Sequence, residues 1–212
     1  MHIEPGILSS AKIAAANLAA VSLLAVQAPQ LIKKPQLILR TLLAALFFSV
    51  FMQSFHMPAG ASELHFIGAM PIYLTLGFVP TLLGFGLGLL LQGVIFEPAD
   101  LLHLGVNVLS LAVPLVALHL SLGRKLAAGA ATEVKSVLKL DATYYTGVAA
   151  MVGFWLSIGQ VATPFAEWAT FAAAYLPVVL IEPVLTVAVV KLLHSQAHRP
   201  LVQLCFAVPA RG

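Results

Sequence analysis

The chain opens with Met1-His2-Ile3-Glu4-Pro5-Gly6, which places a histidine directly after a free amino terminus. Such a terminus can wrap a metal ion with the terminal amine, the deprotonated amide nitrogen of His2 and Nδ1 of the same imidazole. This flat set of nitrogens suits Ni(II) and Cu(II), and Co(II) less strongly, and it leaves one in-plane position open. Because His2 is too bulky for the usual removal of an initiator methionine, we expect the amine of Met1 to remain.

A second group of polar residues follows the second apolar segment, in a loop rich in small residues that runs from His56 to His65. His65, at the start of the next apolar run, can fill the open position of the metal, and His56 is the alternative. Irregular backbone at membrane depth is tolerated only where protein or water covers it, so we expect this loop to line the site. Ser62, Glu63 and Asn107 are candidates for contacts around the ligands, and Asn107 alternatively caps the helix that it begins.

The composition is that of a polytopic membrane protein. The 212 residues are 60% hydrophobic and 9% charged, with a mean hydropathy of +1.00, whereas soluble domains carry about 25% charged residues. The start lacks the basic region and cleavage site of a signal peptide, so the first apolar segment is expected to remain as a span of the cell membrane. The single Cys205 excludes a disulfide framework and a Cys-rich zinc site.

Charged residues divide the chain into seven apolar segments, and about 20 apolar residues are enough to cross the bilayer. Two of the segments share one long uncharged stretch, which Gly77-Phe78-Val79-Pro80 divides. We expect a single integral-membrane domain, 1–212, that is an all-α bundle with an irregular tail at 194–212. The predicted segments are Ile7 to Gln27, Gln36 to Phe55, Leu64 to Leu76, Thr81 to Phe96, Asn107 to Leu122, Leu138 to Gly159 and Phe171 to Leu193.

The orientation of the bundle follows from the distribution of Lys and Arg, which stay on the cytoplasmic side of short loops. With the amino terminus outside, ten of the eleven Lys and Arg residues lie inside, and Lys12 is the exception. The carboxyl terminus is then cytoplasmic. The net charge of +3 is explained by this rule, and we expect no nucleic-acid partner.

One carboxylate, Glu182, lies inside the last apolar segment, directly before Pro183. An ionisable group within a span is costly and is therefore a functional candidate. Two interpretations remain open: a structural role through buried hydrogen bonds and a role in transport. His103, between the fourth and fifth segments, is expected to face the outer water.

Four of these stretches together resemble the substrate-binding membrane subunits of cobalt and nickel energy-coupling-factor transporters, the CbiM/NikM family. The opening Met1-His2-Ile3 resembles the amino terminus of that family. The stretch Gly60 to Gly68 resembles its small-residue loop ending in His, and Gly105-Val106-Asn107 resembles its Gly-x-Asn motif. Ile181-Glu182-Pro183-Val184 resembles its last helix, so the likeness covers most of the chain.

The resemblance implies a seven-helix bundle whose amino terminus is tucked into an outward-facing pocket. It also implies that Met1, His2 and His65 hold the transported metal, Co(II) or Ni(II). Partners are then a transmembrane coupling subunit, cytoplasmic ATPases and a small accessory membrane subunit. The chain has no nucleotide-binding loop of its own, because no Lys and Ser/Thr follow its glycines as such a loop requires. We therefore expect a transport subunit that is not an enzyme.

Two other functions remain open at this point. The first is an intramembrane metal-dependent enzyme that uses His56, Glu63, His65 and His103 as ligands or acid/base groups. The second is a vitamin-binding transporter subunit, which is less favoured because the loops on the outer side concentrate His and carboxylate groups.

Overall fold

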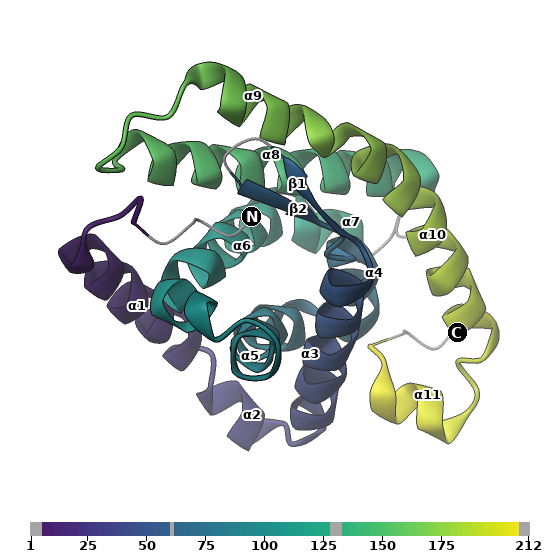
Figure 1. Ribbon diagram of the computed structural model, residues 1–212. Helices are drawn as coiled ribbons and strands as arrows, with labels where there is room; N and C mark the ends of the chain where they lie inside the picture. The colour runs from purple at the N-terminus through teal and green to yellow at the C-terminus, as the bar shows by residue number, and fades with distance from the viewer. Residues whose placement is uncertain (1–5, 60–61, 128–132, 208–212) are drawn as a thin grey trace.

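The chain folds into a helical bundle that holds one short β-hairpin, as the computed structural model shows (Figure 1). The structure describes residues 6–59, 62–127 and 133–207. Its elements, in chain order, are α1 (Ser10–Ala25), α2 (Pro29–Lys33), α3 (Gln36–Ser54), β1 (His56–Ala59), β2 (Ser62–His65), α4 (Ala69–Leu76), α5 (Phe78–Ile95), η1 (Pro98–His103), α6 (Leu104–Leu118), η2 (His119–Gly123), α7 (Arg124–Ala127), α8 (Val134–Ser157), α9 (Phe165–Ala174), α10 (Leu176–Ser195) and α11 (Pro200–Cys205).

Each predicted apolar segment overlaps one of the principal helices, with some boundaries shifted by a few residues. The long uncharged stretch divides at Gly77, where φ is +93°, a conformation that glycine adopts without steric cost. α4 ends at Leu76 and α5 begins at Phe78, three residues before the predicted start at Thr81. The last segment begins earlier than predicted, because α9 starts at Phe165 and is followed directly by α10.

The third segment is only partly helical, which corrects the prediction of a helix from Leu64. Residues Ser62–His65 form strand β2, which pairs with β1 in antiparallel register, and α4 begins only at Ala69. Gly68 lies between them with φ +62°, and a Cβ there would lie 2.6 Å from the ring of Phe51. A glycine at this position therefore allows the chain to leave the hairpin and enter α4.

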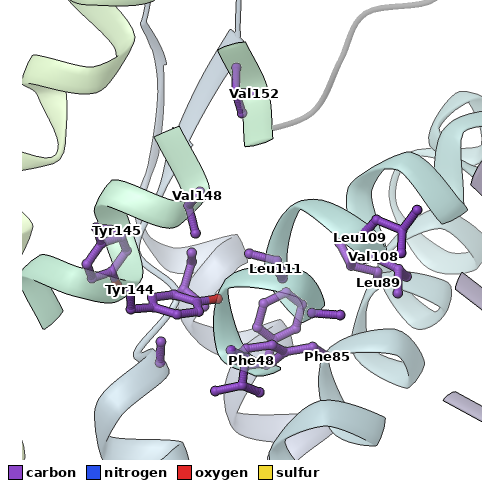
Figure 2. Close-up of a cluster of buried hydrophobic side chains, with 14 of the residues drawn as sticks. Phe48, Phe85, Leu89, Val108, Leu109, Leu111, Tyr144, Tyr145, Val148 and Val152 are labelled. Carbon is purple, nitrogen blue, oxygen red and sulfur yellow. The ribbon is translucent and has the colours of Figure 1, made fainter. Parts of the chain in front are cut away.

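Small residues bring α3 and α5 together at the centre of the bundle. Gly84 faces Ala44, and a Cβ at Gly88 would lie 2.5 Å from the ring of Phe48. Phe48 and Phe85 are fully buried with their ring centroids 5.0 Å apart. Figure 2 shows these rings with the buried side chains of α6 and α8. Close approach of backbones at small residues is the usual way in which helices associate in lipid.

The remaining helices surround this pair. α6 packs against α1, α5 and α8, while α10 packs against α4 and α8. Figure 1 shows α1, α8, α9 and α10 on the periphery, with the hairpin lying across one end of the bundle. We call this end the hairpin end. α3 runs from the opposite end, where Arg40 lies in its second turn, to Ser54 beside β1.

Five stretches of the described chain are long and apolar enough to cross a membrane: Ser10–Lys33, Gln36–Ser54, Phe78–Ile95, Pro98–Gly123 and Phe165–Ser195. The other two predicted spans correspond to α4, which has 8 residues, and α8, whose first half carries Lys135, Lys139 and Asp141. The multi-pass membrane architecture is thus confirmed, while the number of seven spans and the orientation stay predictions.

The tail differs from the irregular segment that was expected. Pro200–Cys205 forms α11, which packs against α3. Arg40 donates hydrogen bonds to the carbonyl oxygens of Gln203 (2.9 Å) and Phe206 (2.7 Å), and the amide of Ala207 donates to the carbonyl of Thr75 at 2.7 Å. The tail is therefore fixed to the end of the bundle opposite the hairpin.

Candidate metal site

The hairpin positions the predicted loop ligand. Its register pairs His56 with His65 and Ala59 with Ser62. His65 is 5% exposed, whereas His56, on the same face of the hairpin, is exposed. The two imidazoles nevertheless stack, with ring centroids 5.9 Å apart. Of the two histidines that the sequence offered, His65 is thus the buried one.

The imidazole of His65 contacts two oxygen atoms. Its Nε2 lies 3.1 Å from Oε2 of Glu63, and its Nδ1 lies 3.4 Å from the carbonyl oxygen of Met52. Only an imidazolium carries a proton on both nitrogens, so a neutral ring donates to one of these oxygens at a time. Glu63 is half-exposed and can therefore release the ring without a large desolvation cost.

Ser62 and Asn107, the other two candidates, are both buried. Asn107 lies three residues inside α6, so the alternative interpretation of Asn107 as the cap of that helix is wrong. The amide of Gly105, in the first turn of α6, instead donates to Oδ1 of Asn17 on α1 at 2.7 Å. Asn107 thus lies within α6 and is buried inside the bundle.

The first two ligands of the predicted site, Met1 and His2, lie outside the described residues. Ile7, near the start of the described chain, is held in place. The amide of Gln160, in the loop before α9, donates a hydrogen bond to its carbonyl oxygen at 2.8 Å. Leu8 is buried in the core. Since α9 also packs on β1 and β2, this anchor lies at the hairpin end.

The described part of the chain contains no group of three or more His, Cys, Asp or Glu side chains that could hold a metal ion. The four-residue ligand set of the enzyme hypothesis is therefore not formed. A metal ion bound at His65 must take most of its ligands from elsewhere, and amine and amide nitrogens are donors of a suitable kind.

His103 departs from the expectation that it faces water. It is 1% exposed at the junction of η1 and α6, and neither ring nitrogen has a hydrogen-bond partner within the described parts of the chain. This burial could not be predicted from the local residues, because Asp100 and the preceding Glu97 are typical of a solvated loop.

Glu182 is completely buried on α10. Its Oε1 accepts a hydrogen bond from the backbone amide of Met70 at 2.8 Å, and its Oε2 accepts one from the hydroxyl of Tyr145 at 2.5 Å. The prediction that this carboxylate is buried and hydrogen-bonded is confirmed. Met70 is the second residue of α4, so Glu182 fixes the start of the helix that follows the hairpin.

A second buried carboxyl, Asp141 on α8, was missed. It has no exposed surface and lies near enough to Glu182 for the two carboxyls to interact electrostatically. The signal was present in the sequence, because Asp141 is the one acidic residue of the apolar segment Leu138 to Gly159. Its position near the end of that segment made it resemble a boundary residue.

Comparison with known proteins agrees with this architecture. A family model described as the cobalt uptake substrate-specific transmembrane region, CbiM, matches residues 2–200. A solved structure described as a transition metal transporter is 21% identical in sequence over 95% of this chain and 96% of its own, with a TM-score of 0.74. Another, described as a truncated transition metal transporter, is 22% identical over 94% and 100% of the two chains, with a TM-score of 0.73.

These two structures are similar to the present one in fold. The comparison with curated proteins gives no match. The family model extends over nearly the whole chain, including its second residue and the hairpin, α6 and α10 that form the candidate site. The chain therefore belongs to the CbiM family of cobalt uptake transmembrane proteins.

Proposed function

We propose that this chain is the metal-capture subunit of an ATP-driven importer and that it binds Co(II) or Ni(II) through its amino terminus and His65. The ligands would be the Met1 amine, the amide and Nδ1 of His2, and one imidazole nitrogen of His65. The observation that carries the proposal is the burial of His65 on a hairpin at the same end of the bundle as the anchored start of the chain.

Chain length supports this arrangement. Ile7 is held by Gln160, and an extended chain spans at most about 3.5 Å per residue, so His2 can lie up to about 18 Å from that anchor. Gly6 has φ +96°, which permits a sharp turn after Pro5. The first residues can thus fold back over the hairpin end, where the protein supplies one further nitrogen ligand.

The ligand set would accept a divalent cation at low electrostatic cost. Metal binding requires a neutral amine, a deprotonated amide and a ring nitrogen without its proton. Oε2 of Glu63 lies 3.1 Å from Nε2 of His65, so this carboxylate would place negative charge beside the cation that the ring would hold.

Transport would depend on other subunits. Because the chain has no phosphate-binding loop, ATP hydrolysis belongs to cytoplasmic partners coupled through a further membrane subunit. The chain itself would select and hold the ion.

Metal analysis of two forms of the purified protein tests the proposal. One form keeps Met1 as the terminus, verified by the mass of the intact chain, and the other carries three added glycines before Met1, because a single added residue would place His2 third and create a new four-nitrogen chelate. The first should hold about one Co(II) or Ni(II) per chain, and the second should lose tight binding because its amine is displaced. Three glycines added after Gly212 are the control. Equal metal affinity in all three forms would refute the proposed chelate.

A further inference from the structure

A basic pocket opens at the end of the bundle opposite the hairpin. It has a volume of about 560 Å³ and lies among the ends of α1, α4 and α6 and the starts of α2, α3, α5 and α7. The tail reaches it at Ala207. Nothing in the proposed metal chemistry uses this pocket, since α3 separates it from the hairpin by the full length of 19 residues.

Its polar wall is cationic. Lys34, Arg40 and Arg124 line it, together with the amides of Gln27, Gln30 and Gln36. None of the described residues that line it is Asp or Glu. Arg40 is held by carbonyl oxygens of the tail, which are neutral, so these bonds orient the guanidinium without neutralising it. Among the residues that the structure describes, three positive charges thus line one cavity without a carboxylate in its lining.

An aromatic group stiffens one side of the pocket. The ring of His119 stacks on Phe78 with centroids 3.9 Å apart and an interplanar angle of 6°. Its Nδ1 lies 2.8 Å from the hydroxyl of Tyr73. His119 also begins η2, a π-helical turn, and such turns occur frequently at functional sites. The first residues of α5, Phe78, Val79 and Pro80, also line the pocket, and the positive end of the helix dipole adds to its potential.

Apolar side chains also line the pocket, namely Leu23, Leu37, Val116 and Leu120. The nearby surface is apolar as well, since Leu120 is 60% exposed and Ile32 is 83% exposed. A free inorganic anion needs no apolar lining. A molecule with a negative head and a hydrocarbon body matches both the cationic and the apolar lining.

We propose that the basic pocket binds the phosphodiester headgroup of an anionic phospholipid. Lys34 and Arg124 would contact the phosphate oxygens, Arg40 would contribute as a fixed charge, and the acyl chains would leave along Leu120. Basic pockets between membrane helices on the cytoplasmic side are common sites for such headgroups, and the charge distribution predicts that this end is cytoplasmic.

The test measures the phospholipid that stays bound to the full chain after purification from bilayers containing phosphatidylglycerol and phosphatidylcholine. Wild-type protein should retain phosphatidylglycerol selectively. Lys34→Gln and Arg124→Gln should each reduce its affinity roughly fivefold, and the double variant roughly twenty-five-fold. Lys139→Gln combined with Lys191→Gln removes the same charge from exposed positions outside the pocket and should leave retention unchanged. Arg40 is kept because it anchors the tail.

Three results would overturn the proposal. The first is equal retention of phosphatidylglycerol by the pocket double variant and the control. The second is saturable binding of inorganic phosphate that displaces the lipid, which would assign the pocket to a soluble anion. The third is unchanged lipid retention with loss of binding to an ATP-hydrolysing partner, which would make the pocket a protein-docking surface.

Discussion

Glu182, on α10, accepts a hydrogen bond from the backbone amide of Met70, 112 positions earlier in the chain and one residue inside α4. The same carboxylate accepts a hydrogen bond from the hydroxyl of Tyr145 on α8. One side chain thus joins the three helices α4, α8 and α10. Because β2 ends at His65 and α4 begins at Ala69, this junction also determines where the hairpin leaves the bundle.

Replacing Glu182 by alanine should destabilise the protein more than replacing it by glutamine. Glu182→Ala leaves the Met70 amide and the Tyr145 hydroxyl buried without partners and should lower the free energy of unfolding by about 3 kcal/mol. Glu182→Gln keeps one carbonyl acceptor and should cost about 1 kcal/mol while metal binding is retained. Thermal unfolding in detergent measures the stability, and metal analysis measures the binding.

Tyr145→Phe provides a matched control, because it removes one donor and leaves the amide of Met70 paired. It should cost about 1 kcal/mol. Loss of metal binding in a folded Glu182→Gln protein would show that the carboxylate belongs to the binding site, and the structural role would then have to be abandoned.

The helices of this protein could be predicted because each rests on a local run of apolar residues. The hairpin could not. Ser62–His65 is a four-residue strand whose burial depends on its packing against α3 and α9, and nothing in its own sequence shows alternation. The hydrogen bond that Asn17 accepts at the start of α6 could not be predicted for a similar reason. Its donor, the amide of Gly105, lies 88 residues away in the chain.

The residues of the candidate site also divide into those that could be predicted from the sequence and those that could not. His65 was predictable because a histidine beside a polar loop in an apolar chain is conspicuous. Asp141 was not, because a carboxyl near the end of a segment resembles a boundary residue until its neighbour Glu182 is known. Met1 and His2 lie outside the described residues, so their role stays a prediction that only binding measurements can test.

Replacing His103 by an apolar residue should not destabilise the protein. Its ring is buried, and neither nitrogen has a hydrogen-bond partner in the described chain, so each carries a desolvation cost without compensation. His103→Phe should therefore leave the melting temperature unchanged or raise it. His119→Phe is the contrast, since it removes the bond to Tyr73 and should lower the melting temperature. A clear loss of stability in His103→Phe would contradict the absence of a partner.

The predicted orientation has a direct test in single-cysteine labelling. In a Cys205→Ser background, Ser136→Cys should react with a membrane-impermeant maleimide only after the cells are opened, because the Lys-rich start of α8 is expected in the cytoplasm. Val161→Cys, in the exposed loop beside Ile7, should react in intact cells. Labelling of position 136 from outside would reverse the topology and place the metal site on the wrong side for import.

His65 should matter to metal affinity less than the terminus does. His65→Ala removes one ligand of four, and water can enter the vacated position, so binding should weaken without being lost. His2→Ala removes the imidazole that closes the chelate and should abolish tight binding. His56→Ala is the matched control, because His56 is the exposed partner of His65 in the same hairpin, and this variant should bind metal normally. A larger loss of affinity in His56→Ala than in His65→Ala would instead identify His56 as the metal ligand.

Acidification should release the metal, and the slope of the logarithm of affinity against pH should report the number of nitrogen ligands. The reference pKa is about 6.5 for imidazole and about 7.7–8.0 for an α-amine, and each ligand must be unprotonated to bind. Affinity should thus fall as pH decreases through both values. Well below pH 6 the logarithm of affinity should change by about four per pH unit, with contributions from the amine, the His2 amide and two imidazoles. In His65→Ala the limiting slope should fall to about three, while in His56→Ala it should stay at about four. Competition titrations with a chelator measure it, and identical slopes for wild type and His65→Ala would remove His65 from the coordination sphere.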